Sequence, residues 1–531
     1  MNKFILYSVS LLFLAGCSSV KKNNACLADL IPPEKLQADV TYTQRKLEKL
    51  HPNLYWYISK KELDRKFDSL RATITQPMTS LEFHKKISPV VCAVREGHMY
   101  VYPPVREYTK KQYDSIKKVG VAPLQQFDLE YNSGKLIVVN NKSYDKSIKP
   151  GSEIVAINGE SPLEIINEYD KYYTSDGFNT TLKKNFAGTR FSTFYSYKHG
   201  LKDALQLDFR FKDSLKTATI KRRIADTTGT GKKNARILTK AEIAKQKADR
   251  RALSKKKSYN GYDELSKRYN RNLRFMEADS SVAVMKIRGF TKGTPGPFYE
   301  ESFKKIKEHH SKALILDLRD NGGGRLYEIA DLYSYLADTT FVFIDESEVV
   351  SKTSLMANMP YFKGGGIVLG AAKAIAAPFV YTYTFFKVRK RGDKYSYAMN
   401  SKPKKIQADA FKGKVYVLIN GGSFSASCIL SSNLKGSKRA YFVGEETGGT
   451  YNGSVAGIMP NIELPASGIK IRVGLVFIAP HYKTEQHGRG IFPDKEIIPT
   501  IADRIAARDP EMEWVLNDIK TKPAADTAAN K

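Results

Sequence analysis

The chain has 531 residues, with 86 Lys or Arg against 55 Asp or Glu, and its formal net charge is +31. This length allows two to four domains with a substantial hydrophobic core. Cysteines are sparse and lack zinc-ligand spacing, which argues against a disulfide framework and a metal site. No metal or cofactor is therefore expected.

Residues 1–16 have the pattern of an export signal, with Lys3 before an apolar run that is too short to span a bilayer. The run ends in Leu14-Ala15-Gly16-Cys17, which resembles the bacterial lipobox, whose cysteine is diacylated. The alternative is an ordinary buried N-terminal helix. We expect a lipid anchor at Cys17, a tether over residues 17–32, and a place in the bacterial cell envelope. Ser18 and Ser19 offer no aspartate retention signal, which favours the outer membrane, facing the periplasm.

Residues 33–105 are predicted to form a helical region. Apolar residues recur at spacings of three and four between residues 34 and 94. The proline pair Pro32-Pro33 precedes the first helix, as is typical of a helix start. The helical pattern ends in Arg95-Glu96-Gly97-His98, where the glycine breaks it.

Residues 120–211 are predicted to form a β-rich domain. Short strands at 127–131 and 135–139 flank an Asn-Ser-Gly turn. The segment 148–160 then resembles the part of a PDZ domain in which a Pro-Gly turn leads into a strand closed by Asn-Gly. We therefore expect a PDZ-like domain here, although its carboxylate-binding loop is not apparent.

Residues 212–275 are predicted to be a basic insertion with few apolar anchors. The cations cluster in runs, namely Lys221-Arg222-Arg223, Lys232-Lys233 and Lys255-Lys256-Lys257. Such runs often bind polyanions. A nucleic-acid partner is not expected, since no recognition fold is apparent and the chain carries an export signal. We expect a solvated insertion near an anionic envelope surface, with polyanion binding as a weaker alternative function.

Strands alternate with helices over residues 281–505, which predicts an α/β core with a parallel or mixed sheet. The expected strands are 282–287, 313–318, 415–419 and 440–443, and the expected helices are 299–309, 326–336 and 427–434. The tail at residues 519–531 is rich in Lys and Ala and is predicted to be disordered.

A serine-rich segment follows the buried strand at 415–419 and contains Ser423, Ser425 and Ser427. A serine at a strand-to-helix turn exposes its hydroxyl near backbone N–H groups with partial positive charge. That geometry suits a nucleophile and the oxyanion that it generates. The alternative is that these serines only cap the helix. On this segment alone, both interpretations remain open.

A glycine-rich turn, Asp317-Leu-Arg-Asp-Asn-Gly-Gly-Gly324, follows the strand at 313–318. Glycines allow close backbone approach and positive φ angles. The turn could donate an N–H to an oxyanion, or it could simply be a tight turn.

Four segments together resemble the C-terminal processing peptidase and tricorn-core family in order and spacing. They are the glycine-rich turn, the serine-rich segment, Val443-Gly-Glu-Glu-Thr-Gly-Gly449 and Gly490-Ile-Phe-Pro-Asp494. The resemblance implies a crotonase-like α/β peptidase core, with Ser425 as nucleophile. It also implies that the backbone N–H groups of Gly323 and Ala426 bind the oxyanion.

The same resemblance suggests a base. One branch of the family has a lysine where this chain has Thr450, so a Ser–Lys dyad is absent at that place. The other branch has a histidine in a segment similar to Arg95-Glu96-Gly97-His98-Met99. His98 is therefore the expected general base. The alternative is a turn residue packed against Tyr100 and Tyr102.

A carboxylate is also expected, because it holds the imidazole in one tautomer. The tricorn-like branch has a glutamate just before the Gly-x-x-Pro-Asp segment, where this chain has His487. Glu485, two residues earlier, is the predicted acid. Glu446, or the loss of this carboxylate, remains an alternative.

The resulting expectation is a serine endopeptidase that cleaves exported or envelope polypeptides without a metal or cofactor. Its partners would be a polypeptide substrate, a membrane through Cys17, and an anionic surface. The alternative from another class is a catalytically silent relative that keeps the fold and binds peptides.

Overall fold

The computed structural model describes residues 20–224, 240–276, 280–357, 366–397 and 401–521. The predicted signal segment with Cys17, and most of the predicted tail, lie outside these residues. The segment predicted as a tether contains α2 (Val20–Ala25) and η1 (Cys26–Ala28). The predicted N-terminal helical region contains α3 (Pro33–Leu50), α4 (Lys60–Ala72) and α5 (Ser80–Cys92). Its spacing pattern is explained by burial, since Leu36, Val40 and Leu47 form the inner face of α3.

A small antiparallel sheet joins this helical region to the C-terminal half of the chain. Its strands are β1 (Tyr100–Val101), β19 (Lys470–Arg472) and β18 (Asn461–Glu463), in that order. The buried carboxylate of Asp39 on α3 also accepts hydrogen bonds from the backbone N–H groups of Ala466 and Ser467, at 3.0 and 2.8 Å. These contacts hold the segment after α5 against the C-terminal half.

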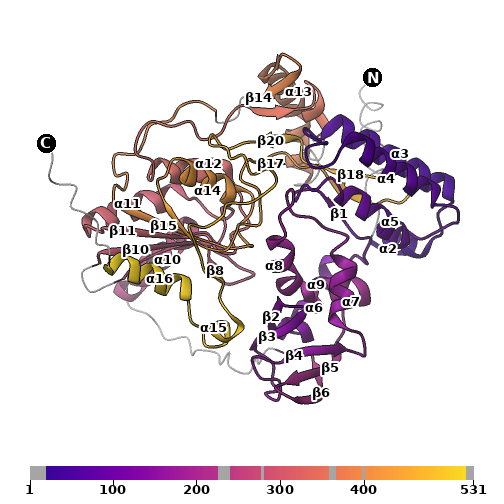
Figure 1. Cartoon of the computed structure of the whole chain (residues 1–531), viewed down its shortest axis with the longest axis horizontal. Coiled ribbons are helices and arrows are strands. Elements are labelled where there is room, and N and C mark those ends of the chain that lie inside the picture. Colours follow the sequence, from indigo (N-terminus) through magenta and orange to yellow (C-terminus); the bar gives the residue numbers. More distant parts are fainter. Residues whose placement is uncertain (1–19, 225–239, 277–279, 358–365, 398–400, 522–531) are drawn as a thin grey trace.

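The β-rich domain has a five-stranded antiparallel sheet in chain order, below the helical region in Figure 1. Its strands are β2 (Phe127–Asn132), β3 (Lys135–Asn141), β4 (Glu153–Ile157), β5 (Ala204–Phe211) and β6 (Ser214–Lys221). The sheet follows α6 (Lys110–Lys118) and η2 (Pro123–Gln126) in the chain. The domain also contains α7 (Pro162–Tyr169), α8 (Thr181–Thr189) and α9 (Phe191–His199). Asn158 and Gly159 both have positive φ, at 49° and 82°, as the predicted tight turn requires. Because β6 pairs with β5 along its whole length, the basic insertion begins later than predicted.

The α/β core predicted from the sequence is confirmed. Its six-stranded sheet has the order β21-β16-β15-β11-β10-β9, and only β9 runs antiparallel to its neighbour. The strands are β9 (Arg271–Met276), β10 (Val282–Ile287), β11 (Ala313–Asp317), β15 (Lys414–Ile419), β16 (Tyr441–Gly444) and β21 (Lys495–Glu496). The basic insertion also ends earlier than predicted, since β9 is an edge strand of the core.

Helices cover both faces of this sheet (Figure 1). On one face, Ala283, Met285 and Leu316 belong to the main core, which includes side chains of α11 (Gly296–Glu308), α12 (Leu326–Ser334) and α14 (Ala426–Gly436). On the other face, Val284 and Ile315 pack with α16 (Pro510–Thr521), which follows α15 (Ile501–Ile505). Alternating strand residues are buried on opposite faces, which explains why the strands read as continuous apolar runs.

Two further parts of the structure are a second five-stranded sheet, which the sequence did not predict, and the basic insertion. A five-stranded sheet has the order β13-β14-β12-β20-β17. Its strands are β12 (Ser347–Val349), β13 (Val388–Arg391), β14 (Lys394–Tyr397), β17 (Ser454–Ala456) and β20 (Val476–Ile478), and η3 (Ser354–Ala357) and α13 (Gly366–Lys387) lie between β12 and β13. The described remainder of the insertion is α10 (Lys240–Asn260) with the short strands β7 (Tyr262–Asp263) and β8 (Arg268–Tyr269). No described helix is long and apolar enough to cross a membrane.

Candidate active site

Two turns meet at the carboxyl ends of the neighbouring parallel strands β11 and β15, which pair through Asp317 and Leu418. In open α/β sheets, this edge is the usual place for a ligand site. The backbone N–H of Phe424 donates to the carbonyl of Asn321 at 3.0 Å. The glycine-rich turn and the serine-rich segment are therefore directly bonded to each other.

The three serines of the serine-rich segment have different environments. The Ser423 and Ser427 hydroxyls are buried and donate to the carbonyls of Leu318 and Asn321, both at 2.8 Å. Ser425 stands at the N-cap of α14 but makes no side-chain cap hydrogen bond, and its backbone has φ 58° and ψ −120°. For a residue other than glycine, such a conformation costs about 1–3 kcal/mol and is common at catalytic centres. The helix-cap interpretation therefore does not describe Ser425.

His98 lies against Ser425, although 327 positions separate them in the chain. Its Nε2 is 2.8 Å from the Ser425 Oγ. The imidazole is buried and stacks on the ring of Phe424, with 4.7 Å between ring centroids. Arg472 on β19 donates to the backbone carbonyl of His98 at 2.8 Å. The β1–β19 pairing and this hydrogen bond place the histidine over the turn that carries the serine.

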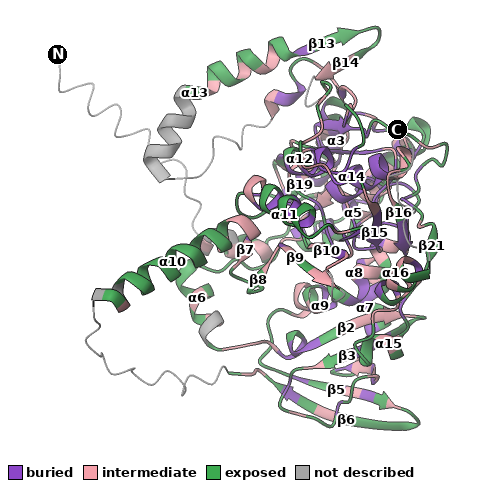
Figure 2. Ribbon diagram, turned by 90° about the vertical axis from the view of Figure 1, so that its left-hand side faces the viewer, coloured by how far each residue is buried: buried purple, intermediate pink, exposed green. Residues whose placement is uncertain are grey.

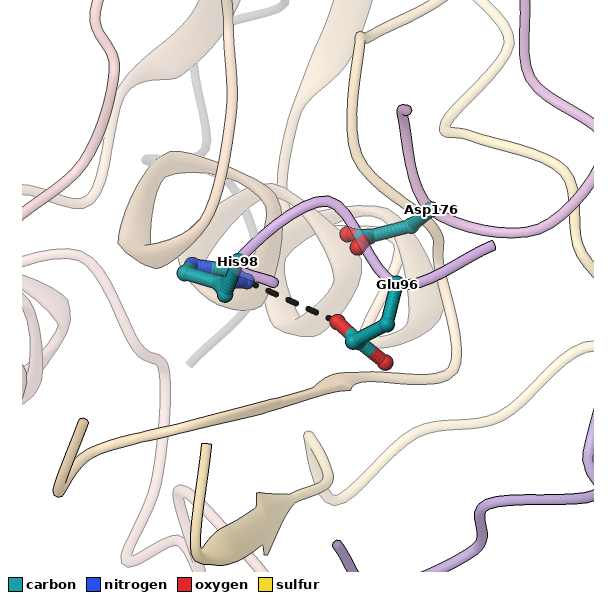
Figure 3. A group of neighbouring side chains, drawn as sticks. All are labelled: Glu96, His98 and Asp176. Carbon is teal, nitrogen blue, oxygen red and sulfur yellow. Dashed lines mark ion pairs between the residues drawn. The ribbon is translucent and has the colours of Figure 1, made fainter. Parts of the chain in front are cut away.

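Two buried carboxyl groups lie on the far side of the imidazole (Figure 3). The Glu96 Oε1 is 3.6 Å from the His98 Nδ1. Neither of these two atoms has a hydrogen-bond partner within the described part of the chain. Asp176 accepts a hydrogen bond from the backbone N–H of Gly97 at 2.7 Å, and a side-chain hydrogen bond links it to Glu96. The order of groups is therefore serine, imidazole, glutamate, aspartate.

Burial perturbs the pKa values of all three acid–base groups. It lowers the pKa of His98, which keeps the imidazole neutral near pH 7 and able to accept a proton. It raises the pKa of Glu96 to about 7. Burial, and then the charge of Glu96, raises the pKa of Asp176 well above its usual range. The hydrogen bond between the two carboxyl groups needs a proton on one of them, and the raised pKa of Asp176 favours Asp176 as the donor.

The same three side chains are close enough to hold a metal ion. One ligand atom from each of Glu96, His98 and Asp176 lies within 4.8 Å of the others. Burial raises the pKa of both carboxyl groups and so favours their neutral forms, which disfavours a bound cation. The arrangement is better suited to orienting an imidazole than to binding a metal.

The two predicted oxyanion donors differ in availability. The Ala426 N–H, at the start of α14, has no acceptor among the residues that the structure describes. The Gly323 N–H donates to the Asn321 Oδ1 at 2.9 Å and is engaged within its own turn. Gly323 nevertheless touches the serine, since an added Cβ would lie 2.7 Å from both the Ser425 Cβ and the Ala426 N. Its φ of +94° also favours glycine.

The structure does not bring Glu485 to the histidine. Glu485 is exposed on the loop after β20, whereas His98 is buried. The alternative acid Glu446 binds Arg489 through both of its oxygens, at 3.0 and 2.6 Å. The carboxyl group beside the imidazole is instead that of Glu96, which stands two positions before the histidine in the chain.

The structure also places the two residues that stand where the family has a glutamate or a lysine, His487 and Thr450. His487, which aligns with the family's glutamate, bonds to the carbonyl of Trp56 at 3.0 Å. Thr450, at the family's lysine position, is buried, and its hydroxyl donates to the carbonyl of Gly453 at 2.6 Å. Sequence reasoning missed Asp176, since Ser175-Asp176-Gly177 lies in the loop before α8 and matches no segment of the resemblance. The sequence did contain a sign of the role of Glu96, because this residue directly precedes Gly97-His98 in the chain.

Comparisons with known proteins bear on the family and on the fold. Residues 281–497 match the model of Peptidase family S41. No curated protein matches the chain. Mature CPAF has a similar fold, with a TM-score of 0.59 and 14% identity over 93% of this chain and 99% of that chain. CPAF complexed with lactacystin gives a TM-score of 0.57 and 14% identity over 92% and 98% of the two chains.

At this level of identity, the likeness to CPAF shows the fold alone. The family match covers the serine-rich segment with Ser425 and the glycine-rich turn beside it. A nucleophile-type serine hydrogen-bonded to a buried histidine at that place is what acyl transfer requires. Residues 281–497 therefore match peptidase family S41, and the protein is a serine-type peptidase.

Proposed function

We propose that the protein is an endopeptidase that cleaves exported or envelope polypeptides, with Ser425 as nucleophile and His98 as general base. The observation that carries this proposal is the 2.8 Å contact between the His98 Nε2 and the Ser425 Oγ. That distance is within the range for direct proton transfer. The depressed pKa of the imidazole supports the same assignment.

The steps follow from these positions. The Ser425 Oγ attacks the scissile carbonyl carbon while its proton passes to the His98 Nε2. The imidazolium then returns this proton to the leaving amine, which leaves an acyl-enzyme. Water attacks the acyl carbon, again with His98 taking a proton, and the carboxylic acid product leaves as Ser425 regains its hydroxyl hydrogen.

We assign the orienting carboxylate to Glu96, with Asp176 positioning it. The imidazolium carries its positive charge only while proton transfer is under way. An ionised Glu96 3.6 Å from the His98 Nδ1 stabilises that charge and favours the tautomer with hydrogen on Nδ1. Asp176 supports this role by donating a hydrogen bond to Glu96, which lowers the pKa of the glutamate against the effect of burial.

The Ala426 N–H is the proposed main oxyanion donor. It has no acceptor among the described residues, and it belongs to the first turn of an α-helix, where N–H groups carry partial positive charge. A second N–H from Gly323 requires release from Asn321. Substrate binding would therefore reorganise the glycine-rich turn.

The remaining assignments concern location and substrate delivery. The export signal and the Leu-Ala-Gly-Cys motif support a lipid anchor at Cys17, in the outer membrane and facing the periplasm. The β-rich domain is the proposed PDZ-like part, presenting a peptide terminus to the site by strand addition. The cations of α10 are almost all exposed, which supports contact with an anionic envelope surface. Mass spectrometry of the N-terminal peptide tests the anchor, since an acylated Cys17 is expected and Cys17→Ser must lose it.

Cleavage of fluorescent casein by the Cys17→Ser chain tests the catalytic assignment. Ser425→Ala and His98→Ala should both abolish cleavage while the circular dichroism spectrum is retained. A fluorophosphonate probe should label the parent chain and fail to label Ser425→Ala. Labelling without cleavage of any unfolded substrate would indicate a latent enzyme. Absence of both labelling and cleavage would favour the peptide-binding alternative, and cleavage by Ser425→Ala would refute the nucleophile.

A further inference from the structure

Helix α13 exposes an aromatic stripe. Phe379, Tyr383 and Phe386 are 75%, 60% and 74% exposed. Their spacing of four and three residues places them on one face of the helix. Figure 2 shows the C-terminal half of α13 extending away from the body of the molecule, with its ribbon coloured mostly as exposed. Large apolar groups gathered in this way mark an interaction surface.

The composition of the helix restricts what this surface fits. Residues 366–387 contain no Asp or Glu, and apolar residues predominate. Pro378 lies inside the continuous helix, and none of the described helices, α13 included, is able to cross a membrane. A helix of this kind that does not span can lie in the bilayer interface, with aromatic side chains at the boundary between headgroups and acyl chains.

Cations follow the aromatic stripe without a break. Lys387, Arg389 and Lys390 have no ion pair with any described acidic residue, whereas Arg391 pairs with Glu346. The Lys387 Nζ lies 5.2 Å from the ring centroid of Tyr383, so one of these charges is in contact with the stripe itself. Cations beside exposed aromatic residues complement a negatively charged lipid surface.

The hairpin β13–β14 connects this surface rigidly to the peptidase. Val388, the first residue of β13, is buried in the main core. Strand β14 pairs with β12 through Tyr395, Ser396 and Tyr397. An attachment at α13 would therefore orient the whole enzyme relative to the surface that it binds.

We propose that α13 and the start of β13 form a docking surface for an anionic lipid bilayer. Phe379, Tyr383 and Phe386 enter the boundary with the acyl chains, while Lys387, Arg389 and Lys390 contact the lipid phosphates. This attachment does not depend on acylation of Cys17 or on catalysis. Membrane signals on one chain act together, so a lipid anchor and this surface would hold the protein at the bilayer more firmly than either does alone.

Co-sedimentation with vesicles tests the proposal on the full chain carrying Cys17→Ser, which cannot be acylated. Vesicles of phosphatidylglycerol and phosphatidylcholine are compared with vesicles of phosphatidylcholine alone. The test variant carries Phe379→Ser, Tyr383→Ser and Phe386→Ser. The control variant carries Leu215→Ser and Leu265→Ser, which remove apolar side chains of similar exposure, 61% and 80%, from other surfaces.

We expect the parent and the control to bind the anionic vesicles, and the test variant to bind about tenfold more weakly or not at all. Replacing Arg389 and Lys390 by Gln should weaken binding by about fivefold per residue. Binding by the test variant equal to that of the parent would overturn the proposal. The proposal would also be overturned if the parent protein did not bind vesicles but self-associated through α13 in sedimentation velocity. The partner of this surface would then be a second copy of the chain. Casein cleavage by all variants serves as the check of folding.

Discussion

Replacing Glu96 with glutamine removes the negative charge beside the imidazole while keeping nearly the same shape. In the folded protein, the Glu96 Oε1 is 3.6 Å from the His98 Nδ1, and both groups are buried. The neutral amide can still contact the ring but cannot stabilise an imidazolium. Glu96→Gln should therefore lower kcat, with a smaller effect on KM, because the charge develops only in the transition state.

The distance sets the size of this effect. Two unit charges 3.6 Å apart attract by about 5 kcal/mol at an effective dielectric constant of about 20. A loss of that size corresponds to about 10³-fold in rate. Asp176 limits the loss, since its pKa falls once the charge of Glu96 is gone, and it then supplies part of the missing negative charge. We expect kcat to fall by about 10²- to 10³-fold.

Initial rates of fluorescent casein cleavage at pH 8 measure this loss, with kcat and KM determined separately. Glu485→Gln is the matched control, since Glu485 is exposed and its change should leave kcat within about twofold of the parent value. Equal kcat values for Glu96→Gln and the parent would refute the assignment of Glu96. A large loss of kcat in Glu485→Gln would instead support Glu485 as the acid that orients the imidazole.

The stability of the same variant provides an independent readout. Because the pKa of Glu96 rises from 4.5 to about 7 on folding, the folded state binds this proton more tightly than the unfolded state does. This stabilising effect is complete below pH 4.5 and is lost as the pH rises through 7. The free energy of unfolding should therefore fall by about 3 kcal/mol over this interval through Glu96. Urea titrations at several pH values should show a shallower decline in Glu96→Gln.

Three further predictions follow. Casein cleavage should rise with pH through about 7, as Glu96 ionises. In Asp176→Ala, which loses the hydrogen bond to Glu96, this rise should move to higher pH. Asp176→Asn keeps a hydrogen-bond donor and should move the rise little. Gly323→Ala should lower kcat by at least about tenfold, because the added Cβ would lie 2.7 Å from Ser425. Gly322→Ala is the control, since its added Cβ would meet no atom within 4 Å. Equal losses of kcat in the two variants would contradict the argument. Arg271→Met should lower the free energy of unfolding by about 1–3 kcal/mol in urea titrations, because the Glu328 Oε1 and the Tyr259 and Lys292 carbonyls lose a buried charged donor, while Arg325 still pairs with Glu328. No measurable loss would disprove this.

Much of the fold could be predicted because its patterns are local. The helices α3, α4 and α5 bury their apolar residues at the helical period that the sequence displays, and the strands β10, β11 and β15 are the short continuous apolar runs expected of strands buried on both faces. The edge strand β9 escaped prediction because its residues, Arg271-Asn-Leu-Arg-Phe-Met276, carry two arginines. Arg271 is fully buried in the structure, and Glu328 neutralises its charge from a distant helix. Sequence alone contained no sign of that pairing.

Helix α13 illustrates the opposite difficulty. Its segment is strongly apolar, which would ordinarily indicate a core helix. In the structure, the aromatic residues of its C-terminal half are exposed. Whether an apolar helix is covered depends on what packs against it, and this is a property of the whole fold.

The sequence by itself determined the two turns of the active site. Glycines and serines at the ends of buried strands set the local backbone, and they require no information from distant residues. Only the tertiary structure decided which groups complete the site. His98 reaches Ser425 across 327 positions because β1 pairs with β19, and Asp176 reaches Glu96 from a loop of the β-rich domain. The acid of the site is set by spatial proximity in a buried, weakly screened environment, and sequence spacing does not encode that proximity.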